Sequence, residues 1–395
     1  MIFSDFQGEQ LSLLGFGTMR LPLIPGGTGA DVDQKRLDEM VDYAIAHGVN
    51  YFDTAFPYHE SMSEIVVGKS LARYPRDKFK LATKYPGHQV SESYNPAEVF
   101  EEQLKKCQVE FFDFYLLHNV NESSIKTYDN PKWGIIDYFI QQKKAGRIKH
   151  LGFSCHADPE CLSVFLDKYG KDMEFCQIQL NYLDWTLQNA EEKYRILTER
   201  GIPVWVMESV RGGKLAKFDD ATEAKFKALR PDDSIASWGF RFLQGLPNVK
   251  MVLSGMSNLE QMIDNVKTFD IRNPLSEAEE KLVFEVAEDI KKAIPCTGCR
   301  YCCDGCPQEL DIPMLIALYN DLRVHPSINI SMKLDAIDAD RLPSQCIGCG
   351  QCAEICPQRI NIPEKMREMN EAFSKLPKWA DICLEREEAA KKQKL

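Results

Sequence analysis

The stretches CTGCRYCCDGCP at 296–307 and CIGCGQCAEICP at 346–357 repeat one cysteine pattern near the end of the chain. Each reads C-x-x-C-x-x-C-x-x-x-C-P, and the copies stay in register beyond the cysteines, since Ile312 and Pro313 match Ile362 and Pro363. The first stretch holds five of the 14 cysteines and the second holds four. Because the chain is long and its first residues do not resemble a secretion signal, this crowding predicts metal binding rather than disulfides.

Runs with this spacing hold [4Fe–4S] clusters, because the two-residue gaps bring three thiolates to one cube while the fourth comes from elsewhere. In two-cluster ferredoxins the fourth cysteine of each run ligates the other cluster. The repeat therefore predicts two clusters with exchanged fourth ligands. The first cluster would be held by Cys296, Cys299, Cys302 and Cys356, and the second by Cys346, Cys349, Cys352 and Cys306.

Two alternatives remain for these cysteines. Cys303 could replace Cys302 as a ligand, although the register with the second copy, where Ala353 matches Cys303, favours Cys302. Each run could also form a structural zinc site with four thiolates. Two identical runs that both end in Cys-Pro favour the iron–sulfur interpretation.

Composition limits the classes of partner that the chain can have. A length of 395 residues indicates two or three domains, and a formal net charge of −11 from mixed acidic and basic residues disfavours nucleic acid and membrane surfaces as partners. No uncharged run approaches the ~18 apolar residues of a membrane span. We therefore expect a cytoplasmic protein with no nucleic-acid or membrane partner.

Residues 11–267 alternate short apolar runs with amphipathic helical stretches. The eight apolar runs are LSLLGFG, VNYFDTA, FKLATKY, FDFYLLH, IKHLGFS, FCQIQLN, IPVWVMES and VKMVLSG. The clearest helical stretches between them are 33–47, 96–107, 132–145 and 190–200, and Gly48, Gly146 and Gly201 follow three of these where a left-handed cap is needed. Eight strand–helix units in series predict an α/β fold, a (β/α)₈ TIM barrel, with a small hairpin before Leu11 at its bottom.

The sequence thus divides into three parts. We expect the barrel over 1–275, a connecting helix over 276–294 that starts with a Ser276/Glu279 capping box, and a mainly helical ferredoxin-like domain over 295–395. The segment between the cysteine runs contains PMLIALYNDLR and ISMKLDAIDAD, which have helical rather than alternating patterns. The last residues, EREEAAKKQKL, are expected to form a helical tail.

Four polar residues follow consecutive strands of the predicted barrel. Asp53, Lys84 and His118 stand at strand ends and Tyr58 lies in the loop after Asp53. Active sites of such barrels lie at the carboxyl ends of the strands, so the four side chains should meet at one mouth. A carbonyl that accepts a hydride needs a proton, which Tyr58 could donate if Lys84 lowered its pKa, while Asp53 held Lys84 and His118 oriented the substrate.

These residues lie in motifs that resemble the aldo-keto reductase family in the family's order. The matching segments are LGFGTM at 14–19, GVNYFDTAFPYH around Asp53 and Tyr58, ATKY around Lys84, FYLLHNV around His118, LGFS at 151–154, SVRGGKL at 209–215 and SGMSNLEQMIDNV at 254–266. With its double-cluster extension, the chain resembles a ferredoxin-bearing bacterial branch of that family. The resemblance implies reduction of a small-molecule carbonyl by NADP(H) or NAD(H), bound without a Rossmann fold.

The resemblance also implies a set of cofactor-binding residues. Gly17 and Thr18 would approach the nicotinamide ribose, Ser154 and Gln177 would bond the carboxamide, and Arg211 and Gly212 would line the pyrophosphate channel. The full set is Gly17, Thr18, Met19, Asp53, Ser154, Gln177, Met207, Val210, Arg211, Gly212, Ser254, Gly255, Asn258, Gln261 and Asn265. The last five of these would surround the adenosine end.

The chain departs from the family pattern at three places. Met207 stands where a stacking aromatic is common, and Cys155 stands where an Asn usually follows the serine of LGFS. The three residues after Gly255, which are Met256, Ser257 and Asn258, include no Arg or Lys for a 2′-phosphate, so the choice between NADPH and NADH stays open.

The predicted barrel and the predicted cluster domain transfer different numbers of electrons. Hydride transfer moves two electrons and each cluster moves one, a mismatch that a flavin usually bridges, and a flavin is possible although no motif for it is present. Three interpretations follow: a carbonyl reductase whose clusters exchange electrons with a redox protein partner, a reductase whose clusters are structural or sense oxygen, or a non-enzymatic redox sensor. The paired Tyr58 and Lys84 favour an enzyme.

Overall fold

A computed structural model of the chain describes residues 1–87, 95–290, 294–324 and 328–378. The chain forms two compact units, Met1–Ala287 and Glu288–Leu395. The expected helical tail from residue 379 onward lies outside the described residues. None of the described helices is long and apolar enough to cross a membrane.

The first unit is a closed barrel of eight parallel strands, as the eight apolar runs predict. Around the barrel the strands follow the order β10-β3-β4-β5-β6-β7-β8-β9. Their bounds are β3 (Leu14–Gly17), β4 (Tyr51–Asp53), β5 (Lys80–Tyr85), β6 (Phe112–Val120), β7 (Ile148–Cys155), β8 (Cys176–Gln179), β9 (Val204–Met207) and β10 (Val249–Ser254). Because all eight run in one direction, their carboxyl ends form a single rim.

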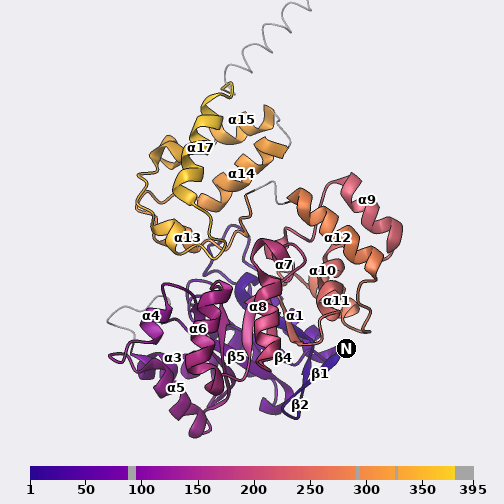
Figure 1. The fold of residues 1–395 in the computed structure, drawn as a ribbon, viewed down its shortest axis with the longest axis vertical. Helices are drawn as coiled ribbons and strands as arrows, with labels where there is room; N and C mark the ends of the chain where they lie inside the picture. The colour runs from indigo at the N-terminus through magenta and orange to yellow at the C-terminus, as the bar shows by residue number, and fades with distance from the viewer. Residues whose placement is uncertain (88–94, 291–293, 325–327, 379–395) are drawn as a thin grey trace, which may run out of the picture. The chain divides into compact units, whose positions relative to one another are not determined.

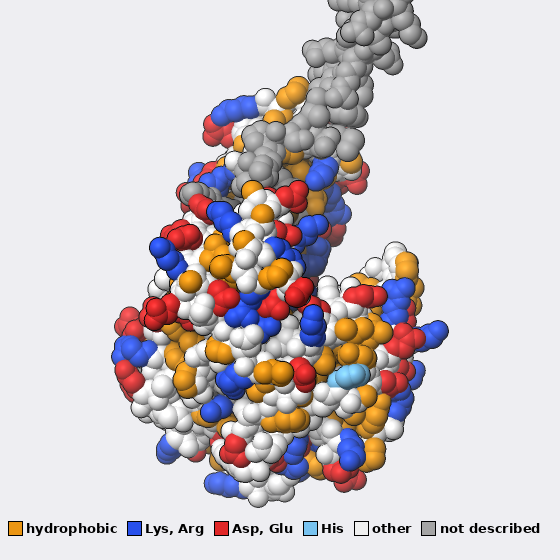
Figure 2. All heavy atoms as spheres, turned by 90° about the vertical axis from the view of Figure 1, so that its right-hand side faces the viewer, with side chains coloured by type: hydrophobic (Ala, Val, Ile, Leu, Met, Phe, Trp, Pro, Cys, Tyr) orange, Lys and Arg blue, Asp and Glu red, His pale blue; other side chains and the backbone are white. Residues whose placement is uncertain are grey.

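Helices surround the strands of this unit (Figure 1). They are α1 (Gln34–Ala46), α2 (Ser63–Leu71), α3 (Pro96–Cys107), α4 (Ile125–Tyr128), α5 (Ile135–Lys144), α6 (Pro159–Tyr169), α7 (Asp184–Leu187), α8 (Ala190–Glu199), α9 (Asp220–Leu229), α10 (Ile235–Gln244), α11 (Leu259–Thr268) and α12 (Glu277–Ile290). Gly48 and Gly201, with φ of 89° and 68°, take the left-handed conformation expected just past a helix end. Acidic and basic side chains are interspersed over the face seen in Figure 2.

A hairpin closes the amino-terminal end of the barrel. Strands β1 (Phe3–Phe6) and β2 (Glu9–Ser12) pair antiparallel, and Phe6 packs edge-on against Trp205 with ring centroids 4.9 Å apart. Phe6 and Leu11 belong to one buried cluster with Tyr51 and Phe114 from the barrel interior. The expected hairpin is therefore present, and it leaves only the carboxyl rim open for a site.

Helix α12 packs on the barrel along most of its length, although the sequence suggested a connector. Glu279 forms an ion pair with Arg230, whose Nε lies 2.5 Å from Oε1, and Phe284 meets Phe242 of α10 edge-on. Glu279 also accepts a hydrogen bond from the Ser276 backbone N–H at 2.7 Å, which is half of the expected capping box. The boundary between the units accordingly falls at Ala287, inside this helix.

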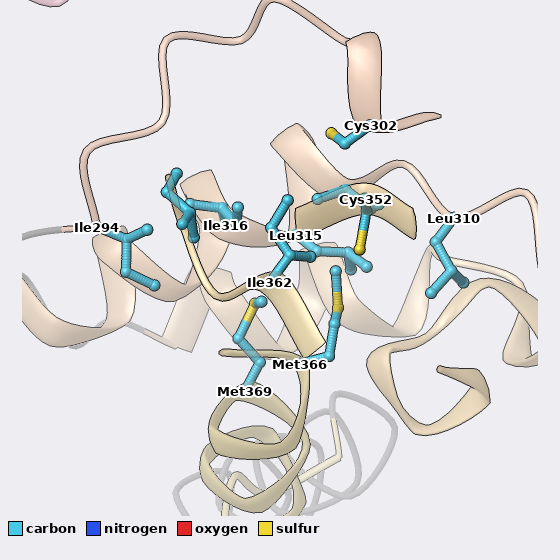
Figure 3. Packing of buried hydrophobic residues seen from close by; sticks show 11 residues of the cluster. Ile294, Cys302, Leu310, Leu315, Ile316, Cys352, Ile362, Met366 and Met369 are labelled. Atoms are coloured by element: carbon cyan, nitrogen blue, oxygen red, sulfur yellow. The ribbon is translucent and has the colours of Figure 1, made fainter. Parts of the chain in front are cut away.

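The second unit is helical over its described residues, as predicted. Its helices are α13 (Tyr301–Asp304), α14 (Ile312–Val324), α15 (Ile328–Asp335), α16 (Gln351–Glu354) and α17 (Ile362–Ser374). A buried cluster joins α13, α14, α16 and α17, and it includes Leu315, Ile362 and Met369 as well as Cys302 and Cys352 (Figure 3). The cysteines of the two runs are thus part of the core of this unit.

Candidate functional site

A buried ion pair lies at the carboxyl rim of the barrel. Asp53 ends β4, Lys84 lies on β5, and Lys84 Nζ is 2.5 Å from Asp53 Oδ1. The same ammonium donates to the Thr54 carbonyl at 2.8 Å, and the Lys84 side chain is fully buried. Two hydrogen bonds in a dry site hold the lysine in one position, because a buried charge needs such partners.

Tyr58 and His118 complete the expected group. The Tyr58 hydroxyl lies 3.5 Å from Lys84 Nζ, and the Tyr58 and His118 rings meet edge-on with centroids 6.0 Å apart. His118 lies within an irregularity of β6, where the pairing with β7 shifts between Leu117 and Val120, and such a bulge changes the direction of a side chain. The structure therefore brings together all four residues that the strand ends predicted.

Burial governs the protonation of this group. It raises the pKa of the Tyr58 phenol, and the carboxylates of Asp53 and Glu208 raise it further. Burial also lowers the pKa of Lys84 and raises that of Asp53, while each partner favours the charged form of the other. The sequence predicted that Lys84 lowers the Tyr58 pKa; the net shift is upward, because burial and the two carboxylates outweigh the attraction of a nearby ammonium for the phenolate. The phenol is instead held protonated, which is the form that can donate a proton.

A second polar network, which the sequence did not reveal, lies behind Lys84. Gln103 of α3 donates to the Lys84 carbonyl at 3.0 Å and to Glu64 Oε1 at 2.6 Å, and Thr83 donates to the same carboxylate oxygen at 2.6 Å. The Tyr115 hydroxyl donates to Gln103 Oε1 at 2.5 Å. These bonds fix the β5 backbone that carries the lysine. No local motif marks them, because their partners lie far apart in the chain.

A cleft with about 770 Å³ of open space extends along the rim past β9 and β10. Six of the residues implied to bind a cofactor line it, namely Val210, Gly212, Ser254, Gly255, Gln261 and Asn265. Arg20, Glu208, Ser257 and Asp264 line it as well, and sequence reasoning missed these four. Arg20 lies near Glu208, with Nη2 3.7 Å from Oε1.

Two implied cofactor residues take other roles. The Arg211 guanidinium is buried and pairs with Asp184, Nη1 to Oδ1 at 2.9 Å, and Arg211 does not line the cleft. The Asn258 side chain caps α11 by accepting from the Gln261 backbone N–H at 2.9 Å. The backbone around Arg211 is left-handed, with φ of 62° at Gly212, a conformation that glycine adopts at little cost.

The remaining implied residues lie near the ion pair or on adjacent strand ends. Thr18 donates to the Asp53 carbonyl at 2.9 Å from the short turn that also contains Met19, and Ser154 accepts from the Asn119 backbone N–H at 2.7 Å. Gln177 of β8 is buried, and its Oε1 has no hydrogen-bond partner among the described residues. Such a buried acceptor suits a ligand amide. Gly17 and Met207 end β3 and β9.

The segment after Tyr58 is strained and is held by His59. His59, Glu60 and Ser61 have φ of 53°, 54° and 68°, a left-handed run that is costly without glycine. His59 Nε2 accepts from the Leu21 backbone N–H at 2.9 Å, and Nδ1 contacts the Gly29 carbonyl at 2.8 Å. Since an amide only donates and a carbonyl only accepts, this arrangement requires a neutral imidazole.

This arrangement predicts acid sensitivity. Burial lowers the pKa of His59 from 6.5 in the folded protein, so the contribution of the neutral ring to stability is complete above pH 6.5. It is lost as the pH falls from 6.5 through the lowered folded value, because the unfolded chain then binds the proton more readily. Unfolding free energies measured against pH should fall more steeply in this window for wild type than for His59→Gln. Identical slopes for the two proteins would contradict this role of His59.

In the second unit the eight predicted ligands gather in two hollows. The first, of about 300 Å³, is lined by Cys296, Cys299, Cys302 and Cys356. The second, of about 360 Å³, is lined by Cys306, Cys346, Cys349 and Cys352. Each hollow thus receives three cysteines from one run and the last cysteine of the other, as the exchanged arrangement requires.

The hollows also bear on the two alternatives for the cysteines. Cys302 lines the first hollow and Cys303 does not. Among the described residues no three Cys, His, Asp or Glu side chains surround one point closely enough to hold a single metal ion. The choice between zinc and an iron–sulfur cluster therefore rests on the cysteine pattern, in which both runs end in Cys-Pro.

Comparison with known proteins gives the class of the chain. Residues 13–288 match the model of the aldo/keto reductase family, and residues 295–361 match that of the 4Fe-4S dicluster domain. The chain belongs to the aldo/keto reductase family and carries a C-terminal 4Fe-4S dicluster domain. It is therefore an oxidoreductase of that family.

Several relatives resemble the barrel part. The chain is 29% identical over 211 residues to "Probable aldo-keto reductase 1" of Glycine max, a match that covers 50% of this chain and 56% of that protein. It is 23% identical over 325 residues to the "NADH-specific methylglyoxal reductase" of Escherichia coli, covering 71% of this chain and 96% of the relative.

Solved structures share the fold. Aldo-keto reductase AKR11C1 from Bacillus halodurans matches with a TM-score of 0.57 and 24% identity, over 72% of this chain and 96% of that one. An aldo-keto reductase from Klebsiella pneumoniae in complex with NADPH matches with a TM-score of 0.57 and 19% identity, over 73% and 96% of the two chains.

Proposed function

We propose that the barrel reduces a small-molecule carbonyl with a nicotinamide dinucleotide, and that Tyr58 is the proton donor. The observation that carries this proposal is the buried Lys84–Asp53 pair with the Tyr58 hydroxyl 3.5 Å from the ammonium and His118 beside it. Four such groups at the open rim match what carbonyl reduction needs: an acid, a charge to stabilise its anion, and a donor that orients the substrate.

The chemistry assigns one role to each residue. When bound, the reduced dinucleotide supplies the hydride that forms the new C–H bond. The carbonyl oxygen then gains negative charge and takes the proton from the Tyr58 hydroxyl, and the Lys84 ammonium stabilises the resulting phenolate. Asp53 keeps Lys84 charged and in place, and His118 directs the carbonyl oxygen. A bulk proton finally restores Tyr58, so one carbonyl, one reduced dinucleotide and one proton are consumed, and one alcohol and one oxidised dinucleotide are formed.

The residues around this group fit the nicotinamide end of the cofactor. The buried Gln177 Oε1 suits the amide N–H of a carboxamide, and Ser154 lies on the neighbouring strand in register with Gln177. The cleft beyond β9 and β10 has room for the rest of an extended dinucleotide. In an anaerobic assay with methylglyoxal, a carbonyl that the name of the Escherichia coli relative suggests as a probe, NADH loss and alcohol formation should be equal. NADH loss without alcohol would contradict the proposal.

We further propose that NADH is the preferred cofactor. Arg20 is the one cationic residue among those that line the cleft, and it lies beside Glu208, while Asp264 adds a second acid. A 2′-phosphate in this cleft would thus meet a cation only beside an acidic side chain. We expect kcat/KM for NADH to exceed that for NADPH by about tenfold, the value of one moderate ionic contact.

A pair of variants tests this preference. Gln261→Arg adds a cation to the lining and should raise kcat/KM for NADPH, whereas Glu260→Gln changes the charge by the same one unit on the exposed neighbour outside the cleft and should not. A wild-type preference for NADPH would show that the acidic lining does not select the cofactor.

For the second unit, we propose that each hollow holds one [4Fe–4S] cluster and that the clusters exchange single electrons with a redox protein partner. Four thiols around each hollow supply the ligands that such a cluster needs. The matched family models cover 13–288 and 295–361, and neither describes a flavin domain. We therefore propose no flavin.

A structural role is the second candidate, and one observation favours it. Cys302 and Cys352 belong to the buried cluster around Leu315 and Ile362, so ligands and core are the same side chains. Metal binding at such sites contributes to folding. If the clusters only brace this unit, dithionite-reduced protein will not pass electrons to a ferredoxin-type acceptor, although its iron content is full.

A further inference from the structure

The two cysteine hollows have nearly the same lining, which makes their differences informative. Pro313 of the first matches Pro363 of the second, and Gln358 matches Gln308. The linings differ in polarity at two matched positions. Thr297 and Arg300 line the first hollow where Ile347 and Gly350 line the second.

Arg300 occupies a position that its backbone makes unfavourable for arginine. Arg300 and Gly350 both precede a short helix in the left-handed conformation, with φ of 67° and 84°. Glycine adopts this conformation freely, whereas a residue with a Cβ is strained there. The second copy has the residue that the backbone favours. The arginine in the first copy therefore has a use that lies in its side chain.

The charge of the Arg300 side chain is the property that distinguishes the first hollow from the second. Among the described residues that line either hollow, Arg300 is the only charged one. Asp311 lies 3.1 Å from Nη1 and offsets part of this charge. Arg359 follows Cys356, a cysteine of the first hollow, whereas Glu309 stands at the matched place after Cys306 of the second. Both differences in charge stabilise an added electron at the first hollow more than at the second.

We propose that Arg300 raises the reduction potential of the cluster held by Cys296, Cys299, Cys302 and Cys356, so that this cluster accepts an electron before the other. The inference rests on the proposed function, in which each hollow holds a [4Fe–4S] cluster. Reduction adds one electron to a cluster already surrounded by four thiolates, and no bond forms or breaks. A nearby cation and the hydroxyl dipole of buried Thr297 stabilise the reduced form, and a lining of isoleucine and glycine does not.

Exposure of the second hollow to water opposes this difference in reduction potential. Cys349 is exposed and Ile347 is 63% exposed, whereas Cys299 is only partly exposed, and water at a cluster also raises its potential. The cation is expected to be the stronger influence because it lies in the lining of the first hollow alone, although Asp311 and solvent reduce its charge effect. The order of reduction is therefore expected to follow Arg300.

The test is an anaerobic titration with dithionite, followed by electron paramagnetic resonance, on the full chain with its iron content measured. Wild type should show two separate midpoint potentials. Arg300→Gly should lower the higher one and leave the other unchanged, and Thr297→Ile/Arg300→Gly should bring the two together. Lys375→Gln removes one positive charge from α17 outside both hollows and should change neither potential.

The outcomes separate the inference from the proposed function. Arg300→Gly protein with full iron content and wild-type potentials would overturn the inference alone, as would a shift confined to the lower potential. Wild-type protein that holds only one cluster after anaerobic reconstitution would contradict the proposed function and the inference together. Because Arg300→Gly installs the residue found at the matched position, the variant is expected to fold.

Discussion

Replacing Tyr58 with Phe is expected to slow carbonyl reduction by about 10²- to 10⁴-fold, the usual contribution of a positioned acid. The change removes the hydroxyl that lies 3.5 Å from Lys84 Nζ and keeps the ring that packs against His118. Because burial raises the pKa of this phenol, the hydroxyl carries its proton across the neutral range, and its loss removes the proton donor of the proposed reaction. NADH affinity, measured by fluorescence titration, should stay within about twofold of wild type.

Tyr169→Phe is the matched control for this variant. The Tyr169 hydroxyl donates to Asp129 on the exposed helical side of the barrel, so its removal should leave kcat unchanged. If Tyr58→Phe kept the wild-type kcat with methylglyoxal and with 4-nitrobenzaldehyde, Tyr58 would not be the proton donor. Lys84→Met should resemble Tyr58→Phe in kcat and should also lower stability, because it leaves the buried Asp53 carboxylate without its cation.

Replacing Cys356 with Ser is expected to remove one of the two clusters, so that the iron content falls from about eight atoms per chain to about four. Cys296 of the first run lines the same hollow as Cys356. The variants Cys296→Ser and Cys356→Ser should therefore lose the same paramagnetic signal. Cys346→Ser and Cys306→Ser should lose the other signal. This pairing across the runs is the feature that distinguishes exchanged ligation from two independent runs.

Cys303→Ser serves as the control for the ligand variants. Cys303 is adjacent to Cys302 yet does not line the first hollow, so its replacement should keep the full iron content. Loss of iron from Cys303→Ser but not from Cys302→Ser would reverse the ligand assignment. Loss of the same signal in Cys346→Ser and Cys356→Ser would contradict the exchange. Because Cys302 and Cys352 are core residues, we also expect lower thermal stability when either hollow loses its iron.

Much of this architecture follows from regular features of the sequence. The eight apolar runs became the eight barrel strands because parallel strands buried on both faces need uninterrupted apolar residues. The ion pair, Tyr58 and His118 could be foreseen since the ends of parallel strands share one rim. The two cysteine groups could be foreseen because the repeat keeps strict spacing.

Other features depend on contacts between distant segments, which spacing does not reveal. Arg211 pairs with the buried carboxylate of Asp184, at the start of α7, and does not line the cleft. Arg20 and Glu208 reach the cleft from loops after β3 and β9, and neither lies in a motif. The Lys84 site is more deeply buried than its sequence suggests, which is why the Tyr58 pKa rises rather than falls.

Aromatic residues in the rim loops illustrate the same limit. Trp185 and Phe218 follow β8 and β9 in the chain, where an apolar pocket would be expected, but Trp185 packs edge-on against Phe242 and Phe218 stacks on Phe226. Tyr85 is buried against Phe139. These aromatic side chains pack against other aromatic residues. Tyr58 and His118 are therefore the better markers of the substrate pocket.

The most direct test of the central claim is to follow deuterium from C4 of the nicotinamide of NADH into the product of methylglyoxal reduction under anaerobic conditions. We predict that the alcohol carries deuterium on the former carbonyl carbon in wild type and in Arg300→Gly alike, because hydride moves within the barrel and the clusters take no part in that step. An alcohol whose new carbon-bound hydrogen comes only from solvent would contradict the account, since it would mean that electrons reach the substrate singly, through the iron–sulfur unit.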